Sequence, residues 1–151
     1  MSGKIREGTK MKVSLTLASL VVLFSVTSHA LSLERCFSLA SRTYGIPIDL
    51  LKAIAKTETG FNPYAINYNN NKSYDMGIMQ INSYWLPKLN KIGVTQADLF
   101  DGCKNIQVGA WILSSNIKQY GFNRKAIGAY NAVSPDKQEI YARKVLSNLS
   151  N

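Results

Sequence analysis

Histidine is almost absent from the chain, and this limits the chemistry available to it. The single histidine, His29, lies in an N-terminal segment that has the features of a secretory signal peptide. Without that segment the chain has no imidazole to act as a general base or to activate a nucleophile, and no histidine pair to bind a metal. Its two cysteines, Cys36 and Cys103, are too few for a four-ligand zinc site. Acid–base chemistry therefore falls to the carboxylates, and no metal or other cofactor is expected.

Glu58 is the carboxylate with the unusual position. Ile54 and Leu51 precede it by four and seven residues, so its side chain continues the apolar stripe of a predicted helix. A carboxylate at the core-facing end of a helix must be paired, hydrogen-bonded or raised in pKa, and a raised pKa suits a general acid near neutral pH. From spacing alone, a structural glutamate that accepts hydrogen bonds from the following loop explains the pattern equally well.

The elements that would position Glu58 are mostly helices. Helical periodicity predicts six helical segments, over about residues 33–44, 47–59, 83–89, 105–120, 123–130 and 134–147. Segment 105–120 is apolar on two sides, which predicts a buried central helix. Segment 134–147 has Ser134 as its N-cap and Pro135 at its first position. Between residues 61 and 80 turn-forming residues replace the helical pattern, which favours a loop with a small β-hairpin.

The first thirty residues do not have the pattern of a folded domain. Residues 1–12 are basic, residues 13–26 are largely apolar, and Ser28-His29-Ala30 has the small residues that precede a signal-peptidase cut. We predict a signal peptide over residues 1–30 and one domain over residues 31–151. The apolar run is shorter than the roughly 20 residues that cross a bilayer, and no later segment is long and apolar enough. An uncleaved anchor and a start at Met11 remain alternatives.

Charge and cysteine content fit an exported protein. The chain has 18 lysines and arginines against nine acidic residues, and removal of residues 1–30 leaves a net charge of about +6. Such a surface attracts anionic partners such as nucleic acid, acidic lipid or a polyanionic wall. The basic residues are dispersed, so we do not expect nucleic-acid binding. In an oxidising compartment Cys36 and Cys103 predict a disulfide, worth about 4 kcal/mol in the chain-entropy picture.

Four segments of the chain match the motifs of one known family. Residues 58–63 (ETGFNP) resemble Glu-Ser-x-Phe-x-Pro, and residues 76–81 (MGIMQI) resemble Gly-Leu-Met-Gln-Ile. Residues 129–132 (AYNA) resemble Ala-Tyr-Asn-Ala-Gly, and residues 141–145 fit a final Tyr-x-x-x-Val. With these segments, in the family's order and over nearly the whole predicted domain, the chain resembles the lysozyme-like lytic transglycosylases, also called the SLT-domain family. The small size of the chain and its predicted signal peptide are most similar to those of the specialised transglycosylases that accompany type III secretion, conjugation and type IV pilus systems.

The resemblance implies a fold and an activity. The fold is α+β, mostly α-helical and lysozyme-like, with a small β element and a glycan-binding groove. The activity is periplasmic cleavage of the β-1,4 bond between N-acetylmuramic acid and N-acetylglucosamine in peptidoglycan, with a 1,6-anhydro product. Glu58 would act first as acid and then as base. Gln80, Tyr130 and Asn131 would position the glycan, although each could instead be a core-lining polar residue.

Two departures and one addition qualify this resemblance. Thr59 replaces the family serine and keeps a hydroxyl, whereas Val133 replaces a glycine and is expected to alter the loop or crowd the groove near Tyr130. Residues 75–83 also resemble the segment of animal-type lysozymes that carries the second catalytic carboxylate, so Asp75 is expected across the groove from Glu58. A turn aspartate that caps backbone N–H groups is the alternative reading.

Two other functions remain open on the sequence. The lysozyme-like segment around Asp75 favours a hydrolytic muramidase, in which water intercepts the intermediate. From a different class, a catalytically weak wall-binding scaffold module would use the positive charge to hold the anionic wall, although the intact Glu58 argues against it. Components of a secretion, conjugation or pilus machine are the expected protein partners.

Overall fold

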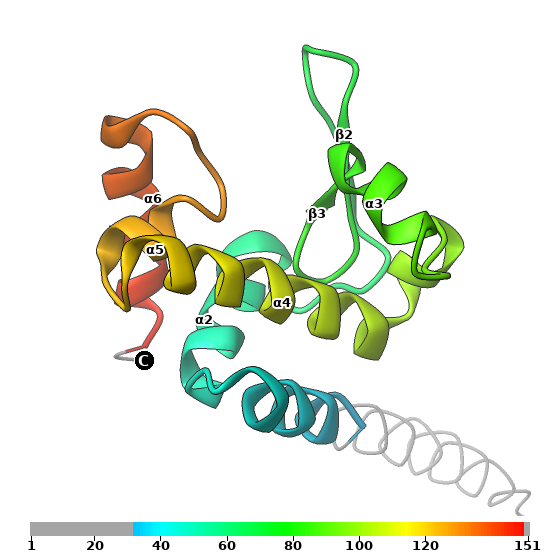
Figure 1. The fold of residues 1–151 in the computed structure, drawn as a ribbon, viewed down its shortest axis with the longest axis horizontal. Helices are drawn as coiled ribbons and strands as arrows, with labels where there is room; N and C mark the ends of the chain where they lie inside the picture. The colour runs from blue at the N-terminus through cyan, green and yellow to red at the C-terminus, as the bar shows by residue number, and fades with distance from the viewer. Residues whose placement is uncertain (1–31, 150–151) are drawn as a thin grey trace, which may run out of the picture. The chain divides into compact units, whose positions relative to one another are not determined.

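The helices and strands of the protein follow the predicted order. The computed structural model describes residues 32–149, and the predicted signal peptide lies outside them. The described elements are a first helix (residues 32–44), α2 (Ile48–Thr59), β1 (Ile66–Tyr68), β2 (Tyr74–Met76), β3 (Ile81–Asn82), η1 (Ser83–Trp85), α3 (Leu86–Asn90), η2 (Ala97–Phe100), α4 (Gly102–Tyr120), α5 (Arg124–Gly128) and α6 (Pro135–Ser147) (Figure 1). None of the described helices is long and apolar enough to cross a membrane.

The differences from the sequence prediction are local. Helix α4 begins at Gly102, earlier than predicted, because the Asp101 side chain caps it by accepting a hydrogen bond from the Lys104 backbone N–H. The 3₁₀ turn η2 was not predicted; Asp98 stabilises it by accepting hydrogen bonds from the Thr95 backbone and hydroxyl. The β element is a three-stranded antiparallel sheet of order β1-β2-β3 and not a simple hairpin.

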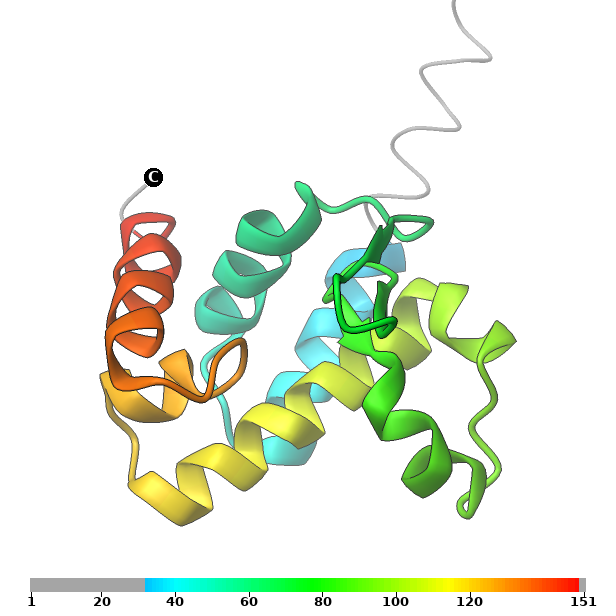
Figure 2. The same cartoon turned by 90° about the horizontal axis from the view of Figure 1, so that it is seen from above.

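Helix α4 is central, as its two apolar sides predict. It runs across the molecule between the sheet and the α5–α6 pair, and α2 lies beside α6 (Figures 1 and 2). The core side chains of α4 are almost fully buried, and they include Ile106, Ala110 and Leu113. They pack in one cluster with Leu51 and Ile54 of α2, so the α2 stripe that ends at Glu58 is anchored in the core.

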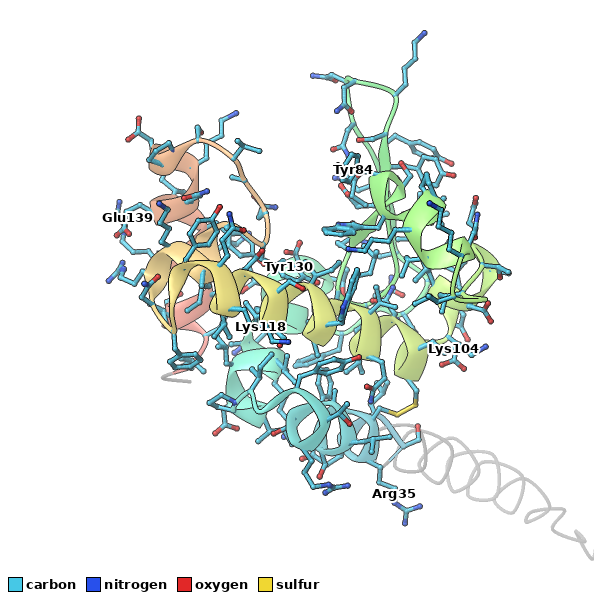
Figure 3. All side chains as sticks on the ribbon, in the orientation of Figure 1. Arg35, Tyr84, Lys104, Lys118, Tyr130 and Glu139 are labelled. Carbon is cyan, nitrogen blue, oxygen red and sulfur yellow. A yellow bond between two sulfur atoms is a disulfide. The ribbon has the colours of Figure 1, made fainter. Side chains whose placement is uncertain are left out.

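A disulfide joins the first helix to α4. Cys36 and Cys103 are bonded, with their Cα atoms 5.1 Å apart, as the cysteine count predicts (Figure 3). The bridge links positions 67 residues apart in sequence and lies at the first turn of α4. It therefore fixes the first helix to the start of the central helix α4.

The segment between β2 and β3 is held on α4 by one buried side chain. The Asn105 carboxamide accepts a hydrogen bond from the Met79 backbone and donates to the carbonyls of Met76 and Leu99, each at 2.8 Å. Gly77 has φ of +75°, and a Cβ there would lie 2.2 Å from the Asn105 amide nitrogen. Only glycine fits this close approach, so the segment has a single well-defined path over α4.

Candidate active site

A polar groove with a volume of about 1120 Å³ brings the predicted residues together. One wall comes from the sheet and η1, the other from the turn after α5 and the start of α6, and α4 contributes Ile112 and Asn116. In Figure 3, Tyr84 and Tyr130 mark these two sides. All five predicted catalytic and substrate-binding residues line the groove, which are Glu58, Asp75, Gln80, Tyr130 and Asn131.

Glu58 is half-buried in the last turn of α2 and is protonatable near neutral pH. Desolvation by burial raises the pKa of its carboxyl from 4.5 to about 7, and the negative charge of Asp75 adds to this rise. The Tyr141 hydroxyl donates a 2.5 Å hydrogen bond to Glu58 Oε1, and this bond and the charge of Lys144 oppose the increase in pKa. The side chain is therefore neutral in a large fraction of molecules at pH 7.

Thr59 and Gly60 set the end of α2 so that Glu58 stays in the groove. Gly60 is the left-handed C-cap of the helix, with φ of 61°. The Thr59 hydroxyl donates to the Ile78 carbonyl at 2.9 Å and accepts from the Asn62 backbone N–H at 3.1 Å. The hydroxyl retained at this position thus links the glutamate's helix to the β2–β3 segment.

Asp75 lies within a strand, and its carboxylate faces the groove. Its neighbour Met76 is fully buried, and successive side chains of a strand point to opposite faces. The Asn82 amide donates to Asp75 Oδ1 at 2.6 Å and the Asn69 amide donates to Oδ2 at 2.9 Å. Among the described residues its bonds thus come from side-chain amides, which differs from a turn aspartate capping backbone N–H groups.

Tyr130 is part of the groove wall, and a hydrogen bond holds its hydroxyl in place. This hydroxyl donates to the Met79 carbonyl at 2.9 Å, and the ring stacks on Tyr141 with centroids 6.4 Å apart. Burial raises the pKa of Tyr130 well above its ordinary value, so the hydroxyl stays protonated. Gly109 of α4 makes room for it, since a Cβ there would lie 2.8 Å from the Tyr130 oxygen.

Gln80 and Asn131 differ in how far their side chains are already engaged. Gln80 has φ of +50° and its amide donates to the Gly77 carbonyl at 2.9 Å, which fixes its orientation in the turn. Asn131 is exposed on the opposite wall. Val133, where a glycine was expected, is 96% exposed at the groove edge, so it does not crowd the interior beside Tyr130.

Two residues that shape the site have no role assigned from the sequence. Tyr141 was noted only as part of a motif, although its hydroxyl bonds Glu58 across 83 positions. Gln138 donates to the carbonyls of Ala132 and Val133 and so fixes the loop that carries Asn131. The motif spacing of Tyr141 was a usable signal, whereas nothing in the local sequence marks Gln138.

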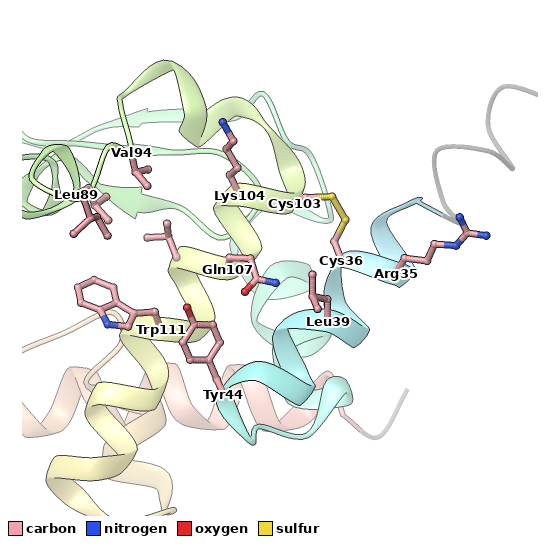
Figure 4. A pocket seen from close by; sticks show the side chains of 12 residues that line it. Arg35, Cys36, Leu39, Tyr44, Leu89, Val94, Cys103, Lys104, Gln107 and Trp111 are labelled. Atoms are coloured by element: carbon pink, nitrogen blue, oxygen red, sulfur yellow. A yellow bond between two sulfur atoms is a disulfide. The ribbon is translucent and has the colours of Figure 1, made fainter.

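A second pocket, of about 440 Å³, lies elsewhere and is apolar. It is formed by the first helix, α4 and residues 89–94, with Leu39 and Trp111 in its wall and Arg35 and Lys104 near its rim (Figure 4). Among the described residues that line it, none is a carboxylate. Because acid–base chemistry in this chain depends on carboxylates, the polar groove is the candidate active site. Within residues 32–149 there is no group of three or more histidine, cysteine or acidic residues that could hold a metal ion.

Comparison with known proteins agrees with this geometry. The sequence model of the transglycosylase SLT domain matches residues 35–144, which contain the whole groove. The chain belongs to the SLT transglycosylase family. It is 42% identical over 118 residues to the invasion protein IagB of Salmonella typhi, covering 75% of this chain and 74% of that protein. It is also 42% identical over 106 residues to protein IpgF of Shigella sonnei, covering 69% of this chain and 70% of the relative.

The fold also matches a solved transglycosylase. An inactive mutant of the lytic transglycosylase Slt from Pseudomonas aeruginosa superposes with a TM-score of 0.63 at 21% sequence identity. The match covers 76% of this chain and 23% of that much longer one. The predicted fold class, mostly helical and lysozyme-like with a small sheet, is thereby confirmed. This SLT-family protein is an enzyme of the peptidoglycan lytic transglycosylase type.

Proposed function

We propose that this transglycosylase cleaves the β-1,4 bond between N-acetylmuramic acid and N-acetylglucosamine and releases a 1,6-anhydromuramic end. The observation that carries the proposal is a glutamate with a pKa of about 7 that shares one polar groove with a fixed aspartate. The groove is large enough for several sugar units, and its walls are rich in amide and hydroxyl groups that bind sugar hydroxyls.

Glu58 would act first as a general acid. Its proton moves to the bridging oxygen, the bond from that oxygen to C1 of the muramic ring breaks, and positive charge develops on the ring. The Glu58 carboxylate then accepts the proton of the C6 hydroxyl of the same sugar, whose oxygen bonds to C1. Glu58 is protonated again at the end, and no water is consumed. A pKa near 7 suits both steps, because each protonation state is accessible at neutral pH.

Asp75 would stabilise the positively charged ring. The amides of Asn69 and Asn82 hold its carboxylate in place before substrate arrives, so little reorganisation is needed as charge develops. Gln80, Tyr130 and Asn131 would position the glycan. The Tyr130 hydroxyl is engaged with Met79, which leaves the ring face as the part of Tyr130 that contacts sugar.

The proposed location is the periplasm, after removal of residues 1–30 as a signal peptide. The proposed role is local opening of the wall for a secretion, conjugation or pilus apparatus. Support comes from the similarity to the invasion protein IagB and from the basic, largely apolar N-terminal segment. The net charge of about +6 that remains fits a protein that acts on an anionic wall.

A hydrolytic muramidase is the second candidate, and Asp75 is the observation that favours it. In retaining glycosidases the second carboxylate stabilises or traps the intermediate that water then attacks. The two candidates share the first half of the reaction and differ only in which hydroxyl attacks C1.

The first test is activity on purified peptidoglycan sacculi. Glu58→Gln keeps the shape and the acceptor for Tyr141 but cannot deliver a proton, so solubilisation should fall at least about a hundredfold. Glu34→Gln makes the same chemical change at an exposed carboxylate that pairs with Lys52, and it should retain wild-type activity. Activity of folded Glu58→Gln within about tenfold of wild type would remove Glu58 from the mechanism.

A further inference from the structure

Among residues 32–149, Lys137 is the one cationic side chain that lines the groove. Among the described lining residues, all other polar side chains are neutral except the carboxylates of Glu58 and Asp75. Lys137 is exposed, and within residues 32–149 no carboxylate lies close enough to form an ion pair with it. Its charge is therefore available to an incoming substrate.

Lys137 has a defined place relative to the reacting groups. It precedes Tyr141 by four residues on α6, and residues at this spacing lie on the same helix face. The separation along the helix axis is about 6 Å, and Tyr141 is the residue that bonds Glu58. Asn131 and Ser134 line the same wall as Lys137, and the Ser134 hydroxyl makes no cap hydrogen bond to its own helix.

We propose that Lys137 binds a carboxylate of the stem peptide that branches from the muramic acid unit next to the cleaved bond. The proposal rests on the peptidoglycan activity proposed above. The glycan backbone itself carries no charge, whereas stem peptides carry free carboxylates. The negative charge of Asp75 repels such anions, and Lys137 attracts them toward the α6 wall. The enzyme would thus select strands whose stems carry free carboxylates over strands whose stems are neutral.

The ammonium group of a lysine acts as a point charge, and an exposed ion pair contributes little to binding affinity. Measurements on exposed ion pairs by double-mutant cycles correspond to at most about a fivefold change in affinity. We therefore expect a preference of about threefold to fivefold, expressed in KM, because Lys137 lies away from the bond that reacts. The preference should weaken in 0.5 M salt, where exposed charges are screened over about 4 Å.

The test compares two peptidoglycan substrates that differ only in charge. Both are acetylated on their amines, and one is then amidated on its carboxylates with carbodiimide and ammonium. Wild type should favour the carboxylate form by about threefold to fivefold in KM, with equal kcat. Lys137→Gln should reduce the preference to less than twofold, and Lys137→Arg should retain it. The matched control, Lys118→Gln, removes an exposed charge of α4 outside the groove and should behave as wild type.

Each outcome separates the inference from the proposed function. Equal cleavage of the two substrates by wild type would refute the carboxylate site and leave the glycan-cleaving activity intact. A preference that persists in Lys137→Gln would likewise refute it, because another group would then read the charge. Cleavage of neither substrate, with a lysozyme control active on the acetylated one, would overturn the proposed function together with this inference.

Discussion

Tyr141→Phe perturbs the ionisation of Glu58 without touching the carboxylate itself. The hydroxyl donates a 2.5 Å hydrogen bond to Glu58 Oε1, and this donation lowers a pKa that burial has raised to about 7. Phenylalanine keeps the ring and its stacking on Tyr130 but removes the donor. Loss of a donor destabilises the charged carboxylate more than the neutral carboxyl, so the pKa of Glu58 must rise further.

The size of the shift follows from the strength of the lost bond. A hydrogen bond to a charged group contributes about 1.5–3 kcal/mol, and one pKa unit corresponds to about 1.36 kcal/mol. The full loss would therefore raise the pKa by one to two units. The groove is open to water, which replaces part of the lost donation, so the lower end applies. We expect the pKa of Glu58 to move from about 7 to about 8.

The assay is the pH dependence of kcat/KM, which reports the ionisation of the free enzyme. Activity should fall on the alkaline side as Glu58 loses its proton, with a midpoint near 7 in wild type and near 8 in Tyr141→Phe. The midpoint is the readout, since the lost bond also loosens the carboxylate and lowers the maximum. Tyr64→Phe, at a ring that is 72% exposed and outside the groove, should leave the midpoint unchanged. An alkaline midpoint that stays fixed, or moves to lower pH, in folded Tyr141→Phe would refute the reasoning.

Two further predictions concern the carboxylates. Asp75→Asn removes a fixed negative charge that is needed most in the transition state. We expect kcat to fall by about tenfold or more, equivalent to about 1.4 kcal/mol, with a smaller change in KM. Near-wild-type turnover on sacculi would leave Glu58 as the sole catalytic carboxylate. Glu58→Gln should stabilise the fold at alkaline pH. The pKa of Glu58 in the folded state, about 7, exceeds its ordinary value of 4.5. The contribution of Glu58 to wild-type stability is therefore fully present below pH 4.5 and is lost as pH rises through 7. Urea unfolding at pH 8 should show the variant more stable by about 1–3 kcal/mol and nearly equal to wild type at pH 4, and a variant no more stable at pH 8 would contradict the assigned burial.

The candidate catalytic residues were predictable because their signals are local. Glu58 places a carboxylate on the apolar stripe at the end of a helix, and Asp75 lies in a short segment that resembles a lysozyme motif. The order of the main helices followed from periodicity, since α2 and α6 each bury one apolar stripe and α4 buries two sides. Even the early start of α4 had a readable signal in Asp101, which is a favourable N-cap residue.

The contacts that tune the site could not be predicted, because they form between elements far apart in sequence. The Tyr141–Glu58 bond depends on how α6 packs against α2, and no local pattern encodes that packing. The Asn105 carboxamide is buried in the middle of an apolar helix, and its purpose is visible only once the β2–β3 segment lies over it. Strand β3 has two residues, which is too short for a period-two pattern to register.

The chemistry of the product tests the central proposal most directly. Purified sacculi are digested in water enriched in heavy oxygen, and the products are examined by mass spectrometry. The masses distinguish attack by the sugar's own C6 hydroxyl from attack by water. The mechanism proposed for Glu58 predicts muramic ends one water lighter than reducing ends, with no heavy oxygen incorporated, and predicts that these ends are absent with Glu58→Gln. Reducing muramic ends that carry the heavy oxygen would contradict it and would establish a hydrolytic muramidase instead.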